Sequence, residues 1–181
     1  MKVSTLLLTY NESDNLVRCL ESLSWCDDIV AVDSGSTDGS QEILKSYGVK
    51  ILFRAFDNFA NQRNFGIVHG DLMHHWILHL DADETTPEKF KNALRALPDE
   101  PDGVDGYYVP SKMMLAGHWL KHAHGYPIYQ ARLGHRDRFR FIQVGHGQRE
   151  HPKARMSTFS EPYVHYNYSH CLLYTSDAAD D

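Results

Sequence analysis

Four short apolar runs, each followed by a segment with helical patterning, constrain the fold of this chain more than any other feature. They span Val3 to Thr9, Ile29 to Val32, Val49 to Phe53 and Trp76 to Leu80. Runs of this length with so few polar residues are typical of strands buried on both faces of a parallel sheet. Because predicted helices separate these strands, the pattern of residues 1–100 predicts an α/β fold, with a doubly wound parallel sheet and helices on both faces.

The segments between these runs carry signals for helix starts and stops. Asn11 or Ser13 can cap the first helix, because a short polar side chain accepts a hydrogen bond from the free amides of the first turn. Asn58 can cap a helix that Gly70 closes. Two further helices are predicted, one after the polar loop 34–39 with Gly48 at its end, and one from 86–88 to Pro98.

The second half of the chain has a different pattern. Strands are predicted over 106–110, 128–133 and 138–144, whereas 113–120 fits either a helix or a strand. Residues 101–170 are rich in His, Arg and Tyr, which favours a polar ligand over a second core. We see no internal repeat or linker, so 1–170 is predicted to be one domain. Residues 171–181 have no cap, turn or amphipathic pattern. We expect them to be a non-native tail on a truncated gene, with an ordinary acidic tail as the alternative.

Composition excludes several classes of protein. The formal charge of -6 argues against nucleic-acid binding, which needs a basic face. The three cysteines form no CxxC pair, and an odd number suits a reducing compartment such as the cytoplasm. No signal peptide is visible, and no apolar run approaches the roughly 20 residues of a membrane span. Any membrane contact is therefore expected to be peripheral.

Three carboxylates, those of Asp81, Asp83 and Glu84, follow the run Trp76 to Leu80 directly. The carboxyl end of a strand is where open α/β sheets bind ligands. Asp81 and Asp83 alternate along an extended backbone, so both can point to one side and hold Mg²⁺ or Mn²⁺. The alternative is a solvated acidic turn that opens a helix, and this short motif alone does not decide between them.

Two other strand ends carry polar residues, in the stretches 9–12 and 33–38. Asp33 can accept hydrogen bonds from a nucleobase or a ribose, and the helix that follows its loop begins with amides that favour anions. Arg63 can contact a diphosphate or a base, or can lie on a surface helix. The combination suits a nucleotide with a diphosphate and a metal. Neither GxGxxG nor GxxxxGK[ST] is present, which disfavours dinucleotide enzymes and P-loop proteins.

These motifs, in order and spacing, resemble the inverting family 2 glycosyltransferases of the GT-A fold. The resemblance rests on Thr9-Tyr10-Asn11-Glu12, on the stretch from Val32 to Gly39, on Asn61-Gln62-Arg63-Asn64 and on Leu80-Asp81-Ala82-Asp83-Glu84. Stretches 119–122, 125–127, 129–133 and 145–150 are similar to the bacterial subgroup that builds the lipopolysaccharide core. The resemblance covers about residues 3–170.

The resemblance implies a fold and an activity. The fold would be Rossmann-like, with a mostly parallel sheet in residues 1–100 and a mixed β region on the acceptor side in 101–170. The activity would be the transfer of one sugar from a nucleotide-diphosphate sugar to a lipid-linked saccharide, with inversion and with Mg²⁺ or Mn²⁺, at the cytoplasmic face of the membrane. The QxxRW motif of processive synthases is missing, which favours single-sugar transfer.

The resemblance also implies roles for single residues. The nucleotide-sugar site would comprise Thr9, Asn11, Glu12, Asp33, Ser34, Arg63, Asp81, Ala82 and Arg132. Within it Asp33 would bind the base, and both arginines would contact the diphosphate or the acceptor. Asp81 and Asp83 would hold the metal, Asp83 more directly. Glu150 would be the general base, with His151 as a competing candidate.

Two other functions compete with this interpretation. The sequence from Asp81 to Thr85 fits the Asp-x-Asp-x-Thr motif of haloacid-dehalogenase-like phosphatases, with Asp81 as nucleophile, although that motif normally follows the first strand. A non-catalytic nucleotide-sugar-binding remnant is the other, because relatives continue past residue 170. His118, His122 and His124 imitate a metal-ligand spacing, but no HExxH or nearby Cys accompanies them, and we expect no structural zinc there.

Overall fold

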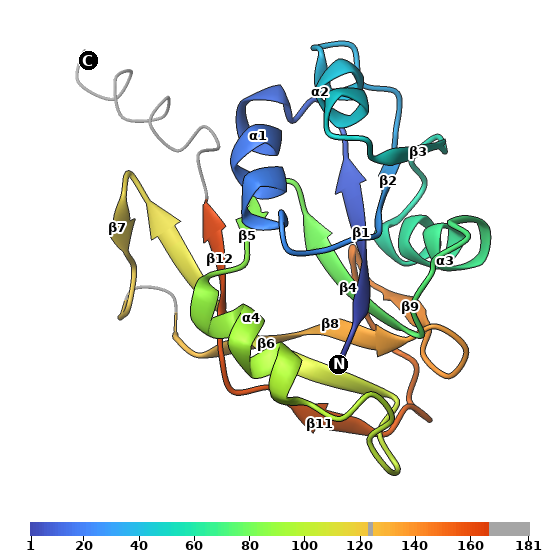
Figure 1. Ribbon diagram of the computed structural model, residues 1–181, viewed down its shortest axis with the longest axis vertical. Coiled ribbons are helices and arrows are strands. Elements are labelled where there is room, and N and C mark those ends of the chain that lie inside the picture. The colour runs from blue at the N-terminus through green and yellow to red at the C-terminus, as the bar shows by residue number, and fades with distance from the viewer. Residues whose placement is uncertain (123–124, 167–181) are drawn as a thin grey trace, which may run out of the picture.

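A mixed sheet of ten strands forms the centre of the protein, within residues 1–122 and 125–166 that the computed structural model describes (Figure 1). The helices are α1 (Ser13–Ser22), α2 (Ser40–Ser46), α3 (Phe59–His69) and α4 (Glu88–Ala96). The strands of this sheet are β1 (Val3–Thr9), β2 (Ile29–Asp33), β3 (Lys50–Phe53), β4 (Trp76–Asp81), β5 (Glu84–Thr85), β6 (Gly106–Leu115), β7 (His118–Trp119), β8 (Ile128–His135), β11 (Met156–Thr158) and β12 (Tyr163–Tyr166). A separate hairpin comprises β9 (Phe141–Val144) and β10 (Gly147–Glu150).

The first four strands form the predicted parallel sheet, in the order β3-β2-β1-β4. Their register decides where the polar strand ends lie. Thr9 is paired with Asp33 on one side of β1, and Leu8 is paired with Asp81 on the other. The carboxyl ends of β1, β2 and β4 therefore meet at one edge of the sheet, as the sequence predicts.

Helices cover both faces of the parallel part because side chains alternate along each strand. Leu7 and Ala31 belong to the core cluster that includes the buried residues of α1, α2 and α4. Leu6 and Val30 face the other way and pack with Ile67 of α3. A side chain at Gly66 would bring its Cβ to 2.5 Å from Leu6 Cδ1, so glycine is what allows α3 to lie close against the sheet.

The second half extends the same sheet with mostly antiparallel pairing. Strand β8 pairs antiparallel with β4, β6 pairs antiparallel with β8, and β12 pairs parallel with β6. The ambiguous segment 113–120 is extended: β6 runs to Leu115 and turns at Ala116 and Gly117, both with positive φ, into β7. The expected mixed β region is therefore present, and the helix alternative for 113–120 is wrong.

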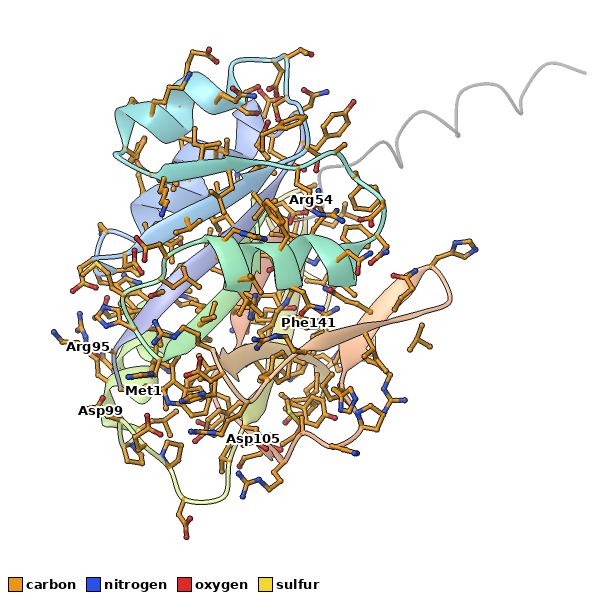
Figure 2. All side chains as sticks on the ribbon, turned by 90° about the vertical axis from the view of Figure 1, so that its right-hand side faces the viewer. Met1, Arg54, Arg95, Asp99, Asp105 and Phe141 are labelled. Carbon is orange, nitrogen blue, oxygen red and sulfur yellow. The ribbon has the colours of Figure 1, made fainter. Side chains whose placement is uncertain are left out.

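The predicted strand 138–144 starts later than expected. The amides of Arg138 and Phe139 both donate to the carbonyl of His135, so the chain turns there and extends from Phe141. The β9–β10 hairpin packs against α3, where Asn64 exchanges two hydrogen bonds with the backbone of Phe141, at 2.8 and 3.1 Å. Figure 2 shows Phe141 on the hairpin strand that lies beneath α3.

The helix caps were predicted only in part. Asn58 caps α3 as expected, accepting from the Asn61 amide at 2.8 Å. Neither Asn11 nor Ser13 caps α1. Instead Asp38, from the loop after β2, accepts from the Ser13 amide at 2.9 Å. In the described residues no helix is long and apolar enough to cross a membrane. The tail 171–181 lies outside the described residues.

Candidate active site

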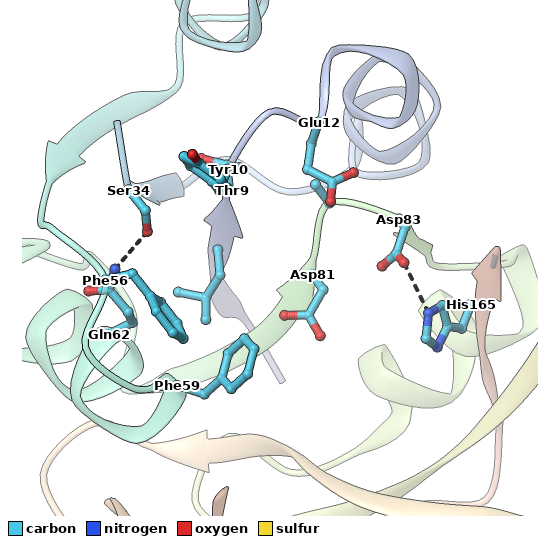
Figure 3. A pocket seen from close by; sticks show the side chains of 12 residues that line it. Thr9, Tyr10, Glu12, Ser34, Phe56, Phe59, Gln62, Asp81, Asp83 and His165 are labelled. Carbon is cyan, nitrogen blue, oxygen red and sulfur yellow. Dashed lines mark hydrogen bonds and ion pairs between the residues drawn. The ribbon is translucent and has the colours of Figure 1, made fainter. Parts of the chain in front are cut away.

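A cavity of about 700 Å³ opens where β1, β2 and β4 end (Figure 3). It is lined by Leu8, Thr9, Tyr10, Glu12, Ser34, Phe56, Phe59, Gln62, Asp81, Ala82, Asp83 and His165. Six of these, namely Thr9, Glu12, Ser34, Asp81, Ala82 and Asp83, are site residues that the sequence predicts. A volume of this size suits a small-molecule ligand such as a nucleotide.

Asp33 lies buried behind this cavity and organises the loop after β2. Its carboxylate accepts from Thr9 Oγ1 at 3.0 Å, from Ser36 Oγ at 2.5 Å, and from the amides of Gly35 and Ser36, each at 3.0 Å. Gln41 Nε2 donates a further bond at 2.8 Å. Burial raises the pKa of Asp33, but these hydrogen bonds outweigh it and keep the pKa below its ordinary value. A nucleobase would have to replace one of these donors, so base binding by Asp33 stays a prediction.

Asn11 has a similar organising position at the end of β1. Its backbone is left-handed, with a φ of 54°, its amide donates to Ser36 Oγ, and its Oδ1 accepts from the Thr37 amide, both at 2.9 Å. Asn11 therefore fastens β1 to the loop after β2. Its side chain is not among those that line the cavity.

One wall of the cavity is aromatic and was not predicted. Phe56 and Phe59 meet edge to face with ring centroids 5.0 Å apart, and both are about half exposed. Gln62, one turn further along α3, donates to Ser34 Oγ at 2.8 Å and so joins this wall to the loop after β2 (Figure 3). The sequence shows only that two phenylalanines, Phe56 and Phe59, lie close together before and at the start of α3, and their exposure, which marks a binding surface, is known from the structure.

Two arginines hold Asp81 in place. Arg63 Nη2 lies 2.7 Å from Asp81 Oδ1, and Arg132 Nη2 lies 2.8 Å from Asp81 Oδ2. Arg132 also pairs with Glu84, whose Oε2 accepts from the Asp81 amide at 2.9 Å. Burial raises the pKa of Asp81, but both guanidinium groups hold that pKa well below its ordinary range. The two guanidinium groups and the carboxyl groups of Asp81 and Glu84 form one network beside the cavity, in which burial raises the pKa of Glu84.

This network corrects one alternative from the sequence. Arg63 is 1% exposed and Arg132 is 5% exposed, so neither lies on a solvated surface. Neither arginine is among the described residues that line the cavity. Each contacts Asp81, which does line it. Each oxygen of Asp81 already accepts from an arginine, so a metal ion at Asp81 would compete with these guanidinium groups.

The surroundings of Asp83 differ from those of Asp81. Its Oδ2 lies 3.0 Å from Nε2 of His165, and both side chains project into the cavity (Figure 3). Burial lowers the pKa of His165, but the Asp83 carboxylate outweighs this and raises it above its ordinary value. A carboxylate oxygen and an imidazole nitrogen that face one another in a cavity form a donor pair that fits a divalent metal, which would replace the present hydrogen bond.

His165 was not among the residues predicted from the sequence. Strand β12 carries it, and the pairing of His165 with Glu84 in β5 sets its place beside Asp83. The amide of Tyr166 also donates to the carbonyl of Asp83, at 2.9 Å. No local motif marks this histidine, because its partner lies 82 residues earlier in the chain.

Glu150 lies apart from these residues, on β10. Its Oε1 accepts from Arg149 Nη2 at 3.2 Å, and the residue is 8% exposed. Burial raises the pKa of Glu150, but hydrogen bonds, including those from Tyr108 and Arg149, outweigh it and keep the pKa below its ordinary value. Glu150 is not among the described residues that line the cavity, and its role as a base stays a prediction.

Comparison with known proteins identifies the class to which this fold and site correspond. The family model for glycosyl transferase family 2 matches residues 4–176, nearly the whole chain. The chain therefore belongs to glycosyl transferase family 2. This membership, together with the three strand–helix units before β4 and the two arginines on Asp81, is inconsistent with the phosphatase alternative. The match also extends into the tail that we expect to be non-native.

Among curated proteins, the chain is 29% identical over 123 residues to the lipopolysaccharide core biosynthesis glycosyltransferase LpsC of Rhizobium meliloti. That match covers 65% of this chain and 45% of LpsC. An uncharacterized glycosyltransferase of Rickettsia prowazekii is 28% identical over 94 residues, which cover 51% of this chain and 32% of that protein. The chain thus spans less than half the length of these relatives.

Solved structures share the fold. A mycobacterial protein superposes with a TM-score of 0.64 at 15% identity, over 92% of this chain and 67% of its own. Residues 1–349 of TarS from S. aureus give 0.53 at 15% identity, over 92% and 60%. Glucosyl-3-phosphoglycerate synthase from Mycobacterium tuberculosis, in complex with Mg²⁺ and UDP, gives 0.51 at 15% identity, over 75% and 56%. The expected GT-A fold is confirmed.

Proposed function

We propose that the cavity binds a nucleotide-diphosphate sugar and that the protein transfers one sugar from it, with inversion, to a saccharide acceptor. The observation that carries this proposal is the pair Asp83 and His165, which face one another in a cavity at three strand ends. The family membership and the synthase of similar fold that was solved with Mg²⁺ and UDP support it. The match to LpsC supports a lipid-linked, lipopolysaccharide-core-like acceptor.

Asp83 and His165 would hold Mg²⁺ or Mn²⁺, which supplies positive charge to the leaving diphosphate. The other residues of the cavity have separate tasks. Thr9, Ser34 and Glu12 offer polar atoms to the nucleoside, and the aromatic wall excludes water from one side. The arginine–carboxylate network fixes the backbone of Asp81, and with it the direction of the turn that carries Asp83.

Glu150 is the proposed base. At neutral pH its lowered pKa leaves the carboxylate ionised and able to accept a proton. The acceptor hydroxyl would pass its proton to this carboxylate as its oxygen attacks the anomeric carbon from the face opposite the diphosphate. The bond from the anomeric carbon to the diphosphate oxygen breaks in the same step, so the anomeric centre inverts without a covalent intermediate.

Calorimetry with UDP-, GDP- and ADP-sugars, in Mn²⁺ and in EDTA, tests the donor assignment. We expect at least one of these donors to bind about tenfold more tightly or better with Mn²⁺, because a metal held by Asp83 and His165 would supply positive charge to the diphosphate. If no donor binds under either condition, the proposal is wrong. Binding without any transfer to a lipopolysaccharide-core acceptor would instead favour a non-catalytic remnant.

A lipid-linked acceptor requires peripheral contact with a membrane, which we propose for the cytoplasmic face and assign to the β6–β7 hairpin. Trp119 on β7 is 37% exposed and meets Tyr126 edge to face at 5.1 Å. Lys112 Nζ lies 4.5 Å and Lys121 Nζ lies 5.6 Å from the centre of the Trp119 ring. Residues 106–136 contain no Asp or Glu, although the whole chain has a formal charge of -6. An exposed Trp beside lysines suits an anionic lipid surface.

Vesicle binding checks this assignment. We expect the protein to bind anionic phosphatidylglycerol vesicles at low salt, and the Lys112→Glu, Lys121→Glu double variant to bind at least about tenfold more weakly, because each lysine near the surface contributes about 1 kcal/mol. Trp119→Ala should also weaken binding. Phe53→Ala is the matched control, since Phe53 is 68% exposed but lies on β3. Equal binding by the lysine variant and the control would contradict the assignment.

A further inference from the structure

A second cluster of metal-ligating side chains lies at the end of the sheet opposite the cavity. His75 precedes β4, His135 ends β8, and Asp137 follows in the turn after β8. One ligand atom from each of these three residues lies within 4.8 Å of the others. Trp76 is paired with His135 across the sheet, so the cluster joins the start of β4 to the end of β8. No residue of this cluster takes part in the proposed transfer.

The three side chains lie close together. The rings of His75 and His135 are nearly parallel, at 12°, with centroids 5.7 Å apart. His75 Nδ1 lies 3.9 Å from Asp137 Oδ2. His135 Nδ1 accepts a hydrogen bond from the Asp137 amide at 3.2 Å, so this nitrogen also points toward Asp137.

The backbone of the cluster is fixed by hydrogen bonds, whereas two of its side chains are free to adjust. The amide of Arg136 donates to the carbonyl of His75 at 2.7 Å. His135 is 4% exposed, and its ring packs edge-on against Trp76 with centroids 5.5 Å apart. The side chains of His75 and Asp137 are 60% and 62% exposed. One ligand is therefore anchored, and two can rotate toward it.

We propose that His75, His135 and Asp137 bind one Zn²⁺ ion, with water as the fourth ligand. Imidazole nitrogen and carboxylate oxygen are ligands that zinc prefers, at about 2.0–2.2 Å, which puts neighbouring donors of a tetrahedral site about 3.4 Å apart. The present spread of up to 4.8 Å is wider, so His75 and Asp137 close on the fixed His135 as the ion binds. The ion takes the place that the Asp137 amide now has at His135 Nδ1.

Neighbouring charges fit this arrangement. Glu100 Oε1 lies 3.7 Å from His135 Nε2, where a carboxylate can orient a histidine that binds metal through its other nitrogen. Arg136 Nε lies 3.7 Å from Asp137 Oδ1, and Arg138 Nη2 lies 3.3 Å from Glu100 Oε2. The long contact between Arg136 and Asp137 is partly exposed and weak, so zinc can replace it. The bound ion would link the nucleotide-binding half, through β4, to the acceptor-side half, through β8.

Cobalt spectroscopy on the whole chain tests the site. The Asp83→Asn background removes the proposed active-site metal, and Co²⁺ serves as the probe because tetrahedral Co²⁺ absorbs strongly in the visible range. We expect one Co²⁺ per chain with a tetrahedral spectrum that Zn²⁺ abolishes by displacement. We also expect saturating Zn²⁺ to raise the melting temperature of the metal-free protein by about 5 °C.

Matched variants assign the signal. His75→Gln with Asp137→Asn should lose both the tetrahedral spectrum and the shift in melting temperature, and should still fold because both side chains are exposed. His118→Gln with His122→Gln, which removes two exposed histidines elsewhere, should keep both. The proposal is overturned if the first pair of substitutions leaves the signals intact, if the second pair removes them, or if no tetrahedral Co²⁺ forms. Because donor binding is measured separately, failure here leaves the proposed transferase function standing.

Discussion

Replacing Asp83 with Asn is expected to abolish the gain in donor affinity that Mn²⁺ provides and to lower transfer by about a hundredfold or more. The amide lacks the negative charge that a divalent ion requires, and His165 alone is a weak site. Donor affinity in EDTA should stay near that of the unchanged protein. The fold should survive, because the Asp83 side chain pairs with one partner, His165, and these two side chains are 26% and 27% exposed. Calorimetry with and without Mn²⁺ measures the first effect, and thermal unfolding measures the second.

Asp81→Asn is the informative comparison for that experiment. It removes the charge that pairs with two buried arginines, Arg63 and Arg132, whose side chains are 1% and 6% exposed. Breaking one partner of a buried ion network costs about 3–5 kcal/mol, because the remaining charge loses its partner without regaining water. We therefore expect Asp81→Asn to lower the melting temperature clearly and Asp83→Asn to leave it almost unchanged. Equal loss of stability in both variants would contradict the different roles assigned here to the two carboxylates.

Glu150→Gln is expected to lower the rate of transfer by about 10²–10⁴-fold, the range for loss of a general base. Donor affinity should not change, since Glu150 does not line the described cavity. The pKa of Glu150 is lowered, so the base stays ionised at neutral pH, and activity should fall only as the medium becomes acidic enough to protonate it. His151→Gln is the neighbouring control. A large loss in His151→Gln with little loss in Glu150→Gln would assign the base to His151.

The predicted parallel sheet and the convergence of its strand ends were accessible from sequence because both depend on local patterns. Apolar runs give the strands, and the register of parallel neighbours then brings Thr9, Asp33 and Asp81 to one edge. The second half was harder to predict because hairpins and long-range pairing decide it. The turn at Ala116 and Gly117 makes the segment 113–120 extended, although its composition also fits a helix.

The site was predictable in its residues but only partly in its contacts. The Asp-x-Asp pattern suggests two equivalent metal ligands. In the structure, however, Asp81 accepts hydrogen bonds from Arg63 and Arg132, which lie 18 and 51 residues from it in the sequence. His165 lies beside Asp83 because β12 pairs with β5, although the two residues are 82 positions apart in the chain. Such partners carry no sequence signal of their own, since a buried Arg and a surface Arg look alike until the packing is known.

Anomalous diffraction from crystals grown with Mn²⁺ and UDP would test the central claim most directly. We predict one strong manganese peak between Asp83 and His165, with the diphosphate completing its coordination, while both arginines keep their contacts to Asp81. A manganese peak bound by Asp81 with Arg63 or Arg132 displaced, or UDP bound in the cavity with no manganese near Asp83, would contradict the account.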